Sequence, residues 1–235
     1  MHLLSFGDQG YGDELFYGAL LTMSLAVVGY LTSLICGVLI AVATLRPFGV
    51  RWTLWRLYAS CFMSVPALLV IFLIYFGGAE MVSAALRLMG VSVRVQVTPF
   101  AAGAVGLGVV YSAYLAEGVR AAILNVPRGQ FEAAQALQLS RLQMWSLVIA
   151  PQATRLALPG LVNLWIVVLK DTALISLVGL KDIIAQAKMA AGVTKEPFLF
   201  YIAAALFFVF MNGLTLHVSG WLDRHVARGM QAARS

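Results

Sequence analysis

The chain has 235 residues, of which 61% are hydrophobic and only 11% are charged. Soluble globular domains usually carry about 25% charged residues, so this composition excludes a soluble protein and indicates an integral membrane protein. The formal net charge is +6. Because the basic residues lie at the ends of apolar runs, we interpret them as topology signals rather than as a nucleic-acid surface.

The apolar segments are long enough to cross a membrane as helices, since a span needs roughly 20 apolar residues. In chain order they cover residues 15–45, 61–86, 99–124, 155–180 and 198–221. Residues 51–58 interleave basic and aromatic side chains, which is typical of a segment at the lipid headgroups. Residues 181–196 are predicted to form a polar loop. The sequence therefore predicts one all-α transmembrane domain over residues 1–235, with about five transmembrane helices.

Two of these segments carry features that constrain packing. Residues 101–108 are nearly all small, which predicts that this face packs closely against another helix. Pro66 lies inside the second predicted span, where it removes a backbone donor and is expected to kink the helix. Membrane helices tolerate such a proline when neighbouring groups satisfy the freed carbonyl.

Residues 125–150 are the polar interruption in this apolar sequence. Pro127 and Gly129 act as breakers, and good helix formers follow from Glu132 onward. We therefore expect an exposed helix, from Glu132 to Leu142, held between two spans. A partner outside the membrane could bind such a helix and move the spans attached to it.

Lysine and arginine residues are distributed unequally between the two sides of the membrane. One side would hold Arg46, Arg51, Arg56, Arg128, Arg141, Arg224, Arg228 and Arg234, and the other Arg87, Arg94, Lys181, Lys188 and Lys195. The positive-inside rule then predicts an external N-terminus, and a cytoplasmic C-terminus and polar interruption.

Four charged residues, Glu117, Arg120, Lys170 and Asp171, lie within or near the predicted spans. Each costs about 2.5 to 3.5 kcal/mol at a helix centre, so each needs a reason to be there. Glu117 and Arg120 share a helix face, and they form either a structural ion pair or a site where Glu117 meets a cationic substrate. Lys170 and Asp171 point in different directions, and they belong either to a cavity or to a buried network.

No catalytic chemistry is predicted. The histidines and cysteines lack the spacing of metal ligands, so no metal site is expected. No phosphate-binding GxxxxGK[ST] loop occurs, and no nucleophile has a base and an acid arranged around it. The sequence indicates a non-enzymatic chain that binds no cofactor of its own.

Several motifs resemble those of a known family. Glu132-Ala133-Ala134, followed by Pro151, is similar to the EAA loop of bacterial ABC-importer permeases. Residues 111–120, 126–130 and 169–176, together with Pro159-Gly160 before Asn163, resemble the polar amino acid permeases of the histidine, arginine and glutamine uptake family. The resemblance covers residues 15–224, and it implies a type I ABC importer permease fold in the bacterial inner membrane.

The resemblance also implies partners and residue roles. Two cytoplasmic ABC ATPase subunits would use ATP, a second permease subunit, related or identical, would complete the pathway, and an external solute-binding protein would deliver a polar amino acid or an opine-like compound. The residues implied in ATPase coupling are Gly129, Glu132, Ala133, Ala134, Leu137, Gln138 and Pro151. Those implied in the substrate pathway are Pro66, Tyr114, Glu117, Asn163, Lys170, Asp171 and Thr172.

The sequence departs from the family at two places. Gln138 stands where the family's loop usually has glycine, and Met63-Ser64 precede Val65-Pro66 where the family often has Arg-Gly. Two other functions stay open on the sequence alone. One is a self-contained secondary carrier or channel that uses Glu117, Lys170 and Asp171, although no inverted repeat is detectable. The other is a structural membrane-assembly subunit without a substrate path.

Overall fold

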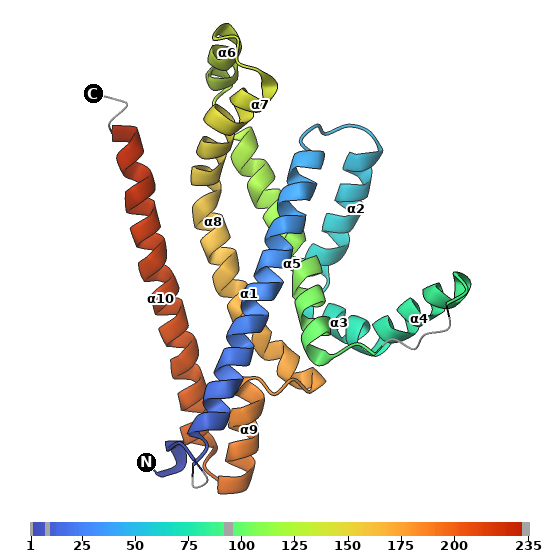
Figure 1. Ribbon diagram of the computed structural model, residues 1–235, viewed down its shortest axis with the longest axis vertical. Coiled ribbons are helices and arrows are strands. Elements are labelled where there is room, and N and C mark those ends of the chain that lie inside the picture. The colour runs from blue at the N-terminus through green and yellow to red at the C-terminus, as the bar shows by residue number, and fades with distance from the viewer. Residues whose placement is uncertain (1, 8–9, 92–95, 232–235) are drawn as a thin grey trace.

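The protein is a bundle of long helices, shown in Figure 1 as a computed structural model that describes residues 2–7, 10–91 and 96–231. The described residues form helices and turns, without a strand. The α-helices are α1 (Gly12–Ala43), α2 (Val50–Ser64), α3 (Ala67–Phe72), α4 (Gly78–Leu88), α5 (Pro99–Leu124), α6 (Arg128–Ala136), α7 (Arg141–Gln143), α8 (Ala150–Asp171), α9 (Ile183–Thr194) and α10 (Pro197–Gln231). Shorter helical turns are η1 (His2–Leu4), η2 (Leu73–Gly77), η3 (Met144–Ile149) and η4 (Thr172–Val178).

Within the described residues, five helical stretches are long and apolar enough to cross a membrane. They are Gly12–Ala43, Ala67–Leu88, Pro99–Leu124, Arg141–Val178 and Pro197–Trp221. Pro99–Leu124 has the bounds predicted from the sequence, because Thr98 accepts a hydrogen bond from the Ala101 amide and Pro99 occupies the first helical turn.

The second predicted span is wrong at its N-terminal end. Residues 50–64 form a separate helix, α2, and the chain is extended at Val65 before Pro66 starts α3. Proline cannot donate the hydrogen bond that would continue the helix, so it ends α2 instead of kinking one long span. The segment expected at the headgroups belongs to α2, which lies beside α1 (Figure 1) and buries Trp55 against α1 and α5.

The fourth helical stretch begins earlier than predicted, at Arg141, and passes through the π-helical turn η3 into α8. The polar loop predicted for residues 181–196 is also wrong, because α9 occupies most of it. Asp182 caps α9 by accepting a hydrogen bond from the Ala185 amide at 2.9 Å. Ala187 and Ala190 then pack against Phe200 at the start of α10.

Helix α5 forms the centre of the bundle, with most of its residues buried. Close packing is possible because its neighbours meet it at glycines. A Cβ atom on Gly37 of α1 would come within 2.7 Å of Leu115, and one on Gly106 of α5 would come within 2.7 Å of Ile71 in α3. The predicted packing role of the small residues 101–108 follows from these contacts, since small residues let backbones approach closely.

The two ends of the bundle differ in composition. Figure 1 places α6, α7, the end of α1, the start of α2 and the end of α10 at one end, and the N-terminus, α9 and α4 at the other. Arg46, Arg51, Arg128 and Arg141 therefore belong to the same end. Arg94 and Arg234, both part of the predicted charge asymmetry, lie outside the described residues.

Asp182 is a buried carboxyl group at the end of the bundle opposite α6. Its side chain is fully buried, and among the residues that the structure describes its Oδ2 has no hydrogen-bond partner. Burial raises the pKa of Asp182 to about 6, although backbone amides at the start of α9 oppose the shift. Since the folded protein binds this proton more tightly than the unfolded chain, protonation stabilises the fold.

We predict that the free energy of unfolding of the wild-type protein falls by about 2 kcal/mol, from this group alone, as the pH rises from about 4 to about 6. Asp182→Asn should abolish this slope, because asparagine keeps a capping oxygen and does not titrate. Thermal unfolding in detergent at several pH values, with Glu196→Gln as an exposed control, would measure it. Equal slopes in Asp182→Asn and wild type would contradict the prediction.

Candidate functional site

The polar interruption folds into a helix, a tight turn and a second helix. Helix α6 ends at Ala136, so the continuous helix predicted from Glu132 to Leu142 is wrong. Gln138 has a left-handed backbone with φ of 55°, the Leu139 amide donates to the Ala134 carbonyl at 3.1 Å, and the Gln138 amide donates to Gln135 at 2.9 Å. This pair of hydrogen bonds is a Schellman motif, which closes a helix C-terminus and usually has glycine at the left-handed position.

The second half of the turn starts a new helix. The Ser140 hydroxyl accepts a hydrogen bond from the Gln143 amide at 3.3 Å, and the Gln143 side chain accepts one from the Ser140 amide at 2.9 Å. This reciprocal capping box fixes the direction of α7, which continues through η3 into α8. Residues 128–151, hereafter the coupling segment, contain α6, α7, η3 and the first residues of α8. The chain therefore passes from α7 into α8 without an irregular loop.

Most of the predicted coupling residues are exposed. Ala134 is buried, whereas the exposed ones are Gly129, Glu132, Ala133, Leu137, Gln138 and Pro151. Apolar side chains beneath α6, among them Phe131 and Trp145, pack on Ile149. The coupling segment therefore presents a free surface while resting on the ends of α5 and α8.

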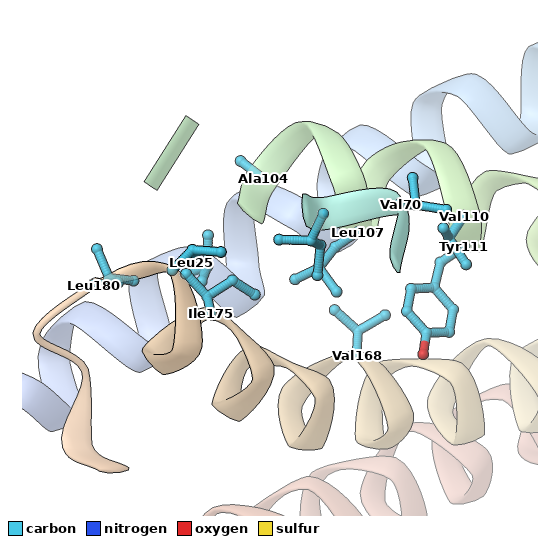
Figure 2. Close-up of a cluster of buried hydrophobic side chains, with 11 residues drawn as sticks. Leu25, Val70, Ala104, Leu107, Val110, Tyr111, Val168, Ile175 and Leu180 are labelled. Atoms are coloured by element: carbon cyan, nitrogen blue, oxygen red, sulfur yellow. The ribbon is translucent and has the colours of Figure 1, made fainter. Parts of the chain in front are cut away.

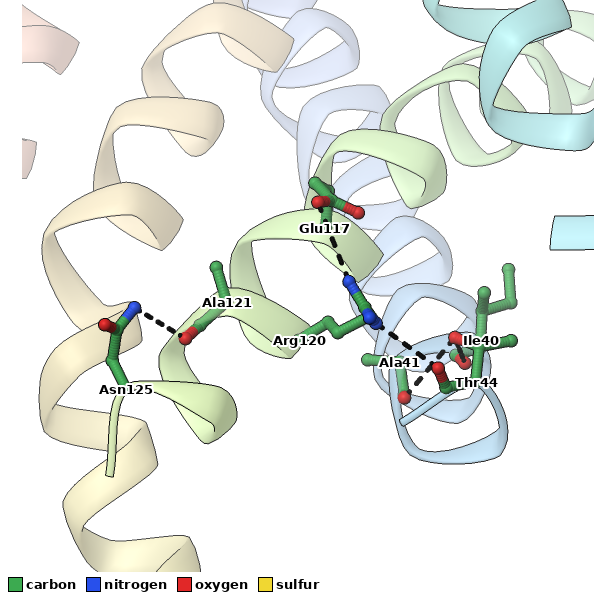
Figure 3. Close-up of polar contacts among 7 residues, drawn as sticks. All are labelled: Ile40, Ala41, Thr44, Glu117, Arg120, Ala121 and Asn125. Carbon is green, nitrogen blue, oxygen red and sulfur yellow. Dashed lines mark hydrogen bonds and ion pairs between the residues drawn. The ribbon is translucent and has the colours of Figure 1, made fainter. Parts of the chain in front are cut away.

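Arg120, near the C-terminal end of α5, contacts the end of α1 at Thr44, as Figure 3 shows. Its side chain is only 12% exposed, its Nε donates to the Thr44 carbonyl at the end of α1 at 3.2 Å, and its guanidinium lies 4.4 Å from the Trp52 ring centroid of α2. Its Nη1 lies 4.0 Å from Oε1 of Glu117, farther than Nε lies from the Thr44 carbonyl, and Glu117 is half exposed. Arg120 thus fastens α1 and α2 to α5, and the ion pair with Glu117 is secondary.

A cavity of about 530 Å³ with both polar and apolar lining lies beside Pro66, between the end of α2 and the start of α3. The Tyr114 hydroxyl donates to the Met63 carbonyl at 3.1 Å, and so satisfies a carbonyl near the break. The Tyr111 hydroxyl donates to Oδ2 of Asp171, and in Figure 2 it points from α5 toward α8. The lining comprises Met63, Ser64, Val65, Pro66, Ala67, Val110, Tyr111, Tyr114, Asn163, Leu164, Val167 and Asp171.

The structure brings together four of the residues predicted for the substrate pathway: Pro66, Tyr114, Asn163 and Asp171. The other three do not line this cavity. Glu117 lies beside Arg120, Lys170 is exposed, and Thr172 is buried and donates to the Leu169 carbonyl at 2.7 Å.

Sequence reasoning missed Tyr111 as a cavity residue. It lies one helical turn before Tyr114 and therefore on the same face of α5. That spacing, opposite an intramembrane aspartate, was the available signal.

Comparison with known proteins identifies the fold and the role. A family model described as "Binding-protein-dependent transport system inner membrane component" matches residues 33–228. The chain belongs to this family. It is 41% identical to the nopaline transport system permease protein NocQ of Agrobacterium fabrum, covering 95% of this chain and 97% of that protein. It is 32% identical to the histidine/lysine/arginine/ornithine transport system permease protein HisQ of Escherichia coli, covering 95% and 98%.

A solved structure agrees with this assignment. The permease resembles a chain in "Crystal structure of an amino acid ABC transporter with histidines", with a TM-score of 0.77, 28% identity, and coverage of 92% of this chain and 95% of that chain. The predicted family, the all-α membrane fold and the role as an ABC-importer permease in the inner membrane are therefore confirmed. The self-contained carrier and the assembly subunit are left without support.

The left-handed position in the coupling segment gives a stability prediction. Replacing a non-glycine residue by glycine at positive φ relieves strain of roughly 1 kcal/mol, so Gln138→Gly should raise the melting temperature of the purified permease. Gln138→Val should lower it, because a β-branched side chain fits this backbone conformation worst. Thermal unfolding of both variants beside Gln135→Gly, an exposed helical control expected to destabilise, would measure the effect. A destabilised Gln138→Gly would contradict the assigned turn.

Proposed function

We propose that this permease imports polar amino acids or related opine-like compounds, driven by ATP that a separate pair of cytoplasmic ATPase subunits hydrolyses. A second permease subunit, related or identical, would complete the pathway, and an external solute-binding protein would deliver the substrate. The chain itself would hold no nucleotide and act as one transmembrane domain. The observation that carries the proposal is the exposed coupling segment, joined directly to the helix that contributes Asp171 to the cavity.

The coupling segment has the properties that a mechanical contact needs. Glu132 and Leu137 are exposed for a partner to bind, while the Schellman motif and the capping box keep the turn rigid. Arg120 connects the same end of the bundle to α1 and α2. A displacement of the coupling segment would therefore move several spans together rather than bend a loop.

The cavity supports a substrate with a cationic group. Asp171 is a carboxylate within a membrane-spanning stretch, and Tyr111 supplies it with one hydrogen bond, which leaves further acceptor capacity. Asn163 adds both a donor and an acceptor to the same cavity. An ammonium or guanidinium group would pair with Asp171 by charge-assisted hydrogen bonds, the strong class of polar contact in a protein.

The proposed orientation follows the positive-inside rule. The end that carries the coupling segment, together with Arg46, Arg51, Arg128 and Arg141, would face the cytoplasm. The N-terminus and α9 would face outward, where the binding protein would dock. This orientation puts the coupling segment on the side where ATP is available.

Glu132 offers a test of the coupling segment. We expect Glu132→Lys to reduce recovery of the ATPase with the affinity-purified permease roughly tenfold, because a reversed charge at an interface is strongly unfavourable. Glu196→Lys, the same charge change at the opposite end of the bundle, should leave recovery unchanged. Equal recovery with Glu132→Lys and wild type, together with unimpaired uptake, would remove the coupling role.

Asp171 offers a test of the cavity. Asp171→Asn should weaken uptake of a cationic amino acid about tenfold or more, since a hydrogen bond to a charged group contributes about 1.5 to 3 kcal/mol. The matched control is Glu80→Gln, an exposed carboxylate outside the cavity. Uptake by the reconstituted complex should be compared with the amount of permease in the membrane. A loss of uptake that only tracks a loss of protein would assign Asp171 a structural role.

A further inference from the structure

A second concave surface, separate from the cavity at Pro66, lies at the coupling end of the bundle. It is a groove of about 330 Å³ between the end of α1 and α2. It is lined by Ile40, Ala43, Thr44, Arg51, Leu54, Trp55 and Tyr58. The four α2 residues occupy one face of that helix, at the spacing of successive turns, so the groove runs along the helix from Arg51 inward.

The floor of this groove is largely hydrocarbon, and the polar groups of Thr44 and Tyr58 that lie in it have hydrogen-bond partners. The Thr44 hydroxyl donates to the Ile40 carbonyl at 2.7 Å, and the Thr44 carbonyl accepts from Arg120. The Tyr58 hydroxyl donates to the Val109 carbonyl at 2.6 Å. Because these polar atoms already have partners within the protein, the floor suits an apolar chain better than a polar ligand.

The mouth of the groove is cationic. Arg51 lines it and is exposed, and Arg46 lies in the short connection between α1 and α2. The sequence between Glu14 and Glu80 contains no aspartate or glutamate, and within the described residues neither arginine forms an ion pair. The α2 N-terminus begins at the same place without a side-chain cap, so its dipole adds to the positive potential.

An apolar groove with a cationic mouth matches one class of molecule in the surroundings of this protein. We propose that the groove binds an anionic phospholipid, with an acyl chain along Leu54 and Trp55 and the phosphate at Arg51. Both parts of the lipid have a counterpart, because the arginines complement the phosphate charge and the floor, where the polar groups of Thr44 and Tyr58 are already paired, favours hydrocarbon. Basic pockets between membrane helices on the cytoplasmic side are suited to anionic headgroups for this reason.

The proposal is tested on the complete complex in nanodiscs that contain equal amounts of phosphatidylglycerol and phosphatidylcholine. Native mass spectrometry after release should show phosphatidylglycerol retained in preference to phosphatidylcholine. Arg51→Gln should reduce the retained phosphatidylglycerol about fivefold, the effect of one arginine near a lipid surface. Ala43→Phe, which fills the groove and keeps the charge, should reduce it as well, so that the result does not depend on one variant.

Matched controls separate this groove from general effects. Lys195→Gln removes an exposed cation at the opposite end of the bundle, and Ser60→Phe adds a large side chain at an exposed position of α2 that does not line the groove. Both should retain phosphatidylglycerol as the wild type does.

Several outcomes would overturn the proposal. Equal retention of both lipids would do so, as would unchanged retention in Arg51→Gln and Ala43→Phe. Full displacement by inorganic phosphate would show a phosphate site without an acyl chain. Cross-linking from Leu54→Cys to the ATPase instead of to lipid would show that a protein covers the groove.

Discussion

The close approach of α1 and α3 to α5 is the constraint on which the rest of the structure depends. A methyl group on Gly37 or Gly106 would collide with Leu115 or Ile71, so the helices can pack this tightly only because those side chains are absent. In a membrane no hydrophobic effect drives helices together, and contact area between small residues does so instead. The tight core leaves α5 with its tyrosines and Arg120 in fixed positions, from which the cavity and the junction with α1 are built.

The sequence determined α5 well and α2 poorly, for physical reasons. Thr98 and Pro99 mark the start of α5 unambiguously, whereas hydropathy alone does not reveal that the chain stops being helical at Val65. Helix α9 was missed because its buried face is made of alanines such as Ala187 and Ala190, which give a weak amphipathic pattern. Only the capping aspartate, Asp182, signals where α9 begins.

Site residues were predictable where burial of charge or polarity is costly. Asp171 is detectable because a carboxylate in a span demands an explanation. Its partner Tyr111 gives a weaker signal, because the ring of a tyrosine packs well among apolar side chains once its hydroxyl has a hydrogen-bond partner. Lys170 carries the same signal as Asp171 but lies on the exposed side of α8. The free-energy cost of burying a charge in the membrane therefore identifies unusual residues in the sequence. Only the three-dimensional structure shows which of these residues line the same cavity.

The interruption at Val65 and Pro66 has a mechanical consequence. No proline amide exists to bridge the two helices there, and the Met63 carbonyl is held by Tyr114 rather than by the next helical turn. Helices α2 and α3 are therefore separate helices that join at Val65 and Pro66. Helix α2 is held to α5 through Trp52 and Arg120, and α3 is held to α5 through Ile71 and Gly106, so the two helices contact α5 at separate points on either side of the cavity.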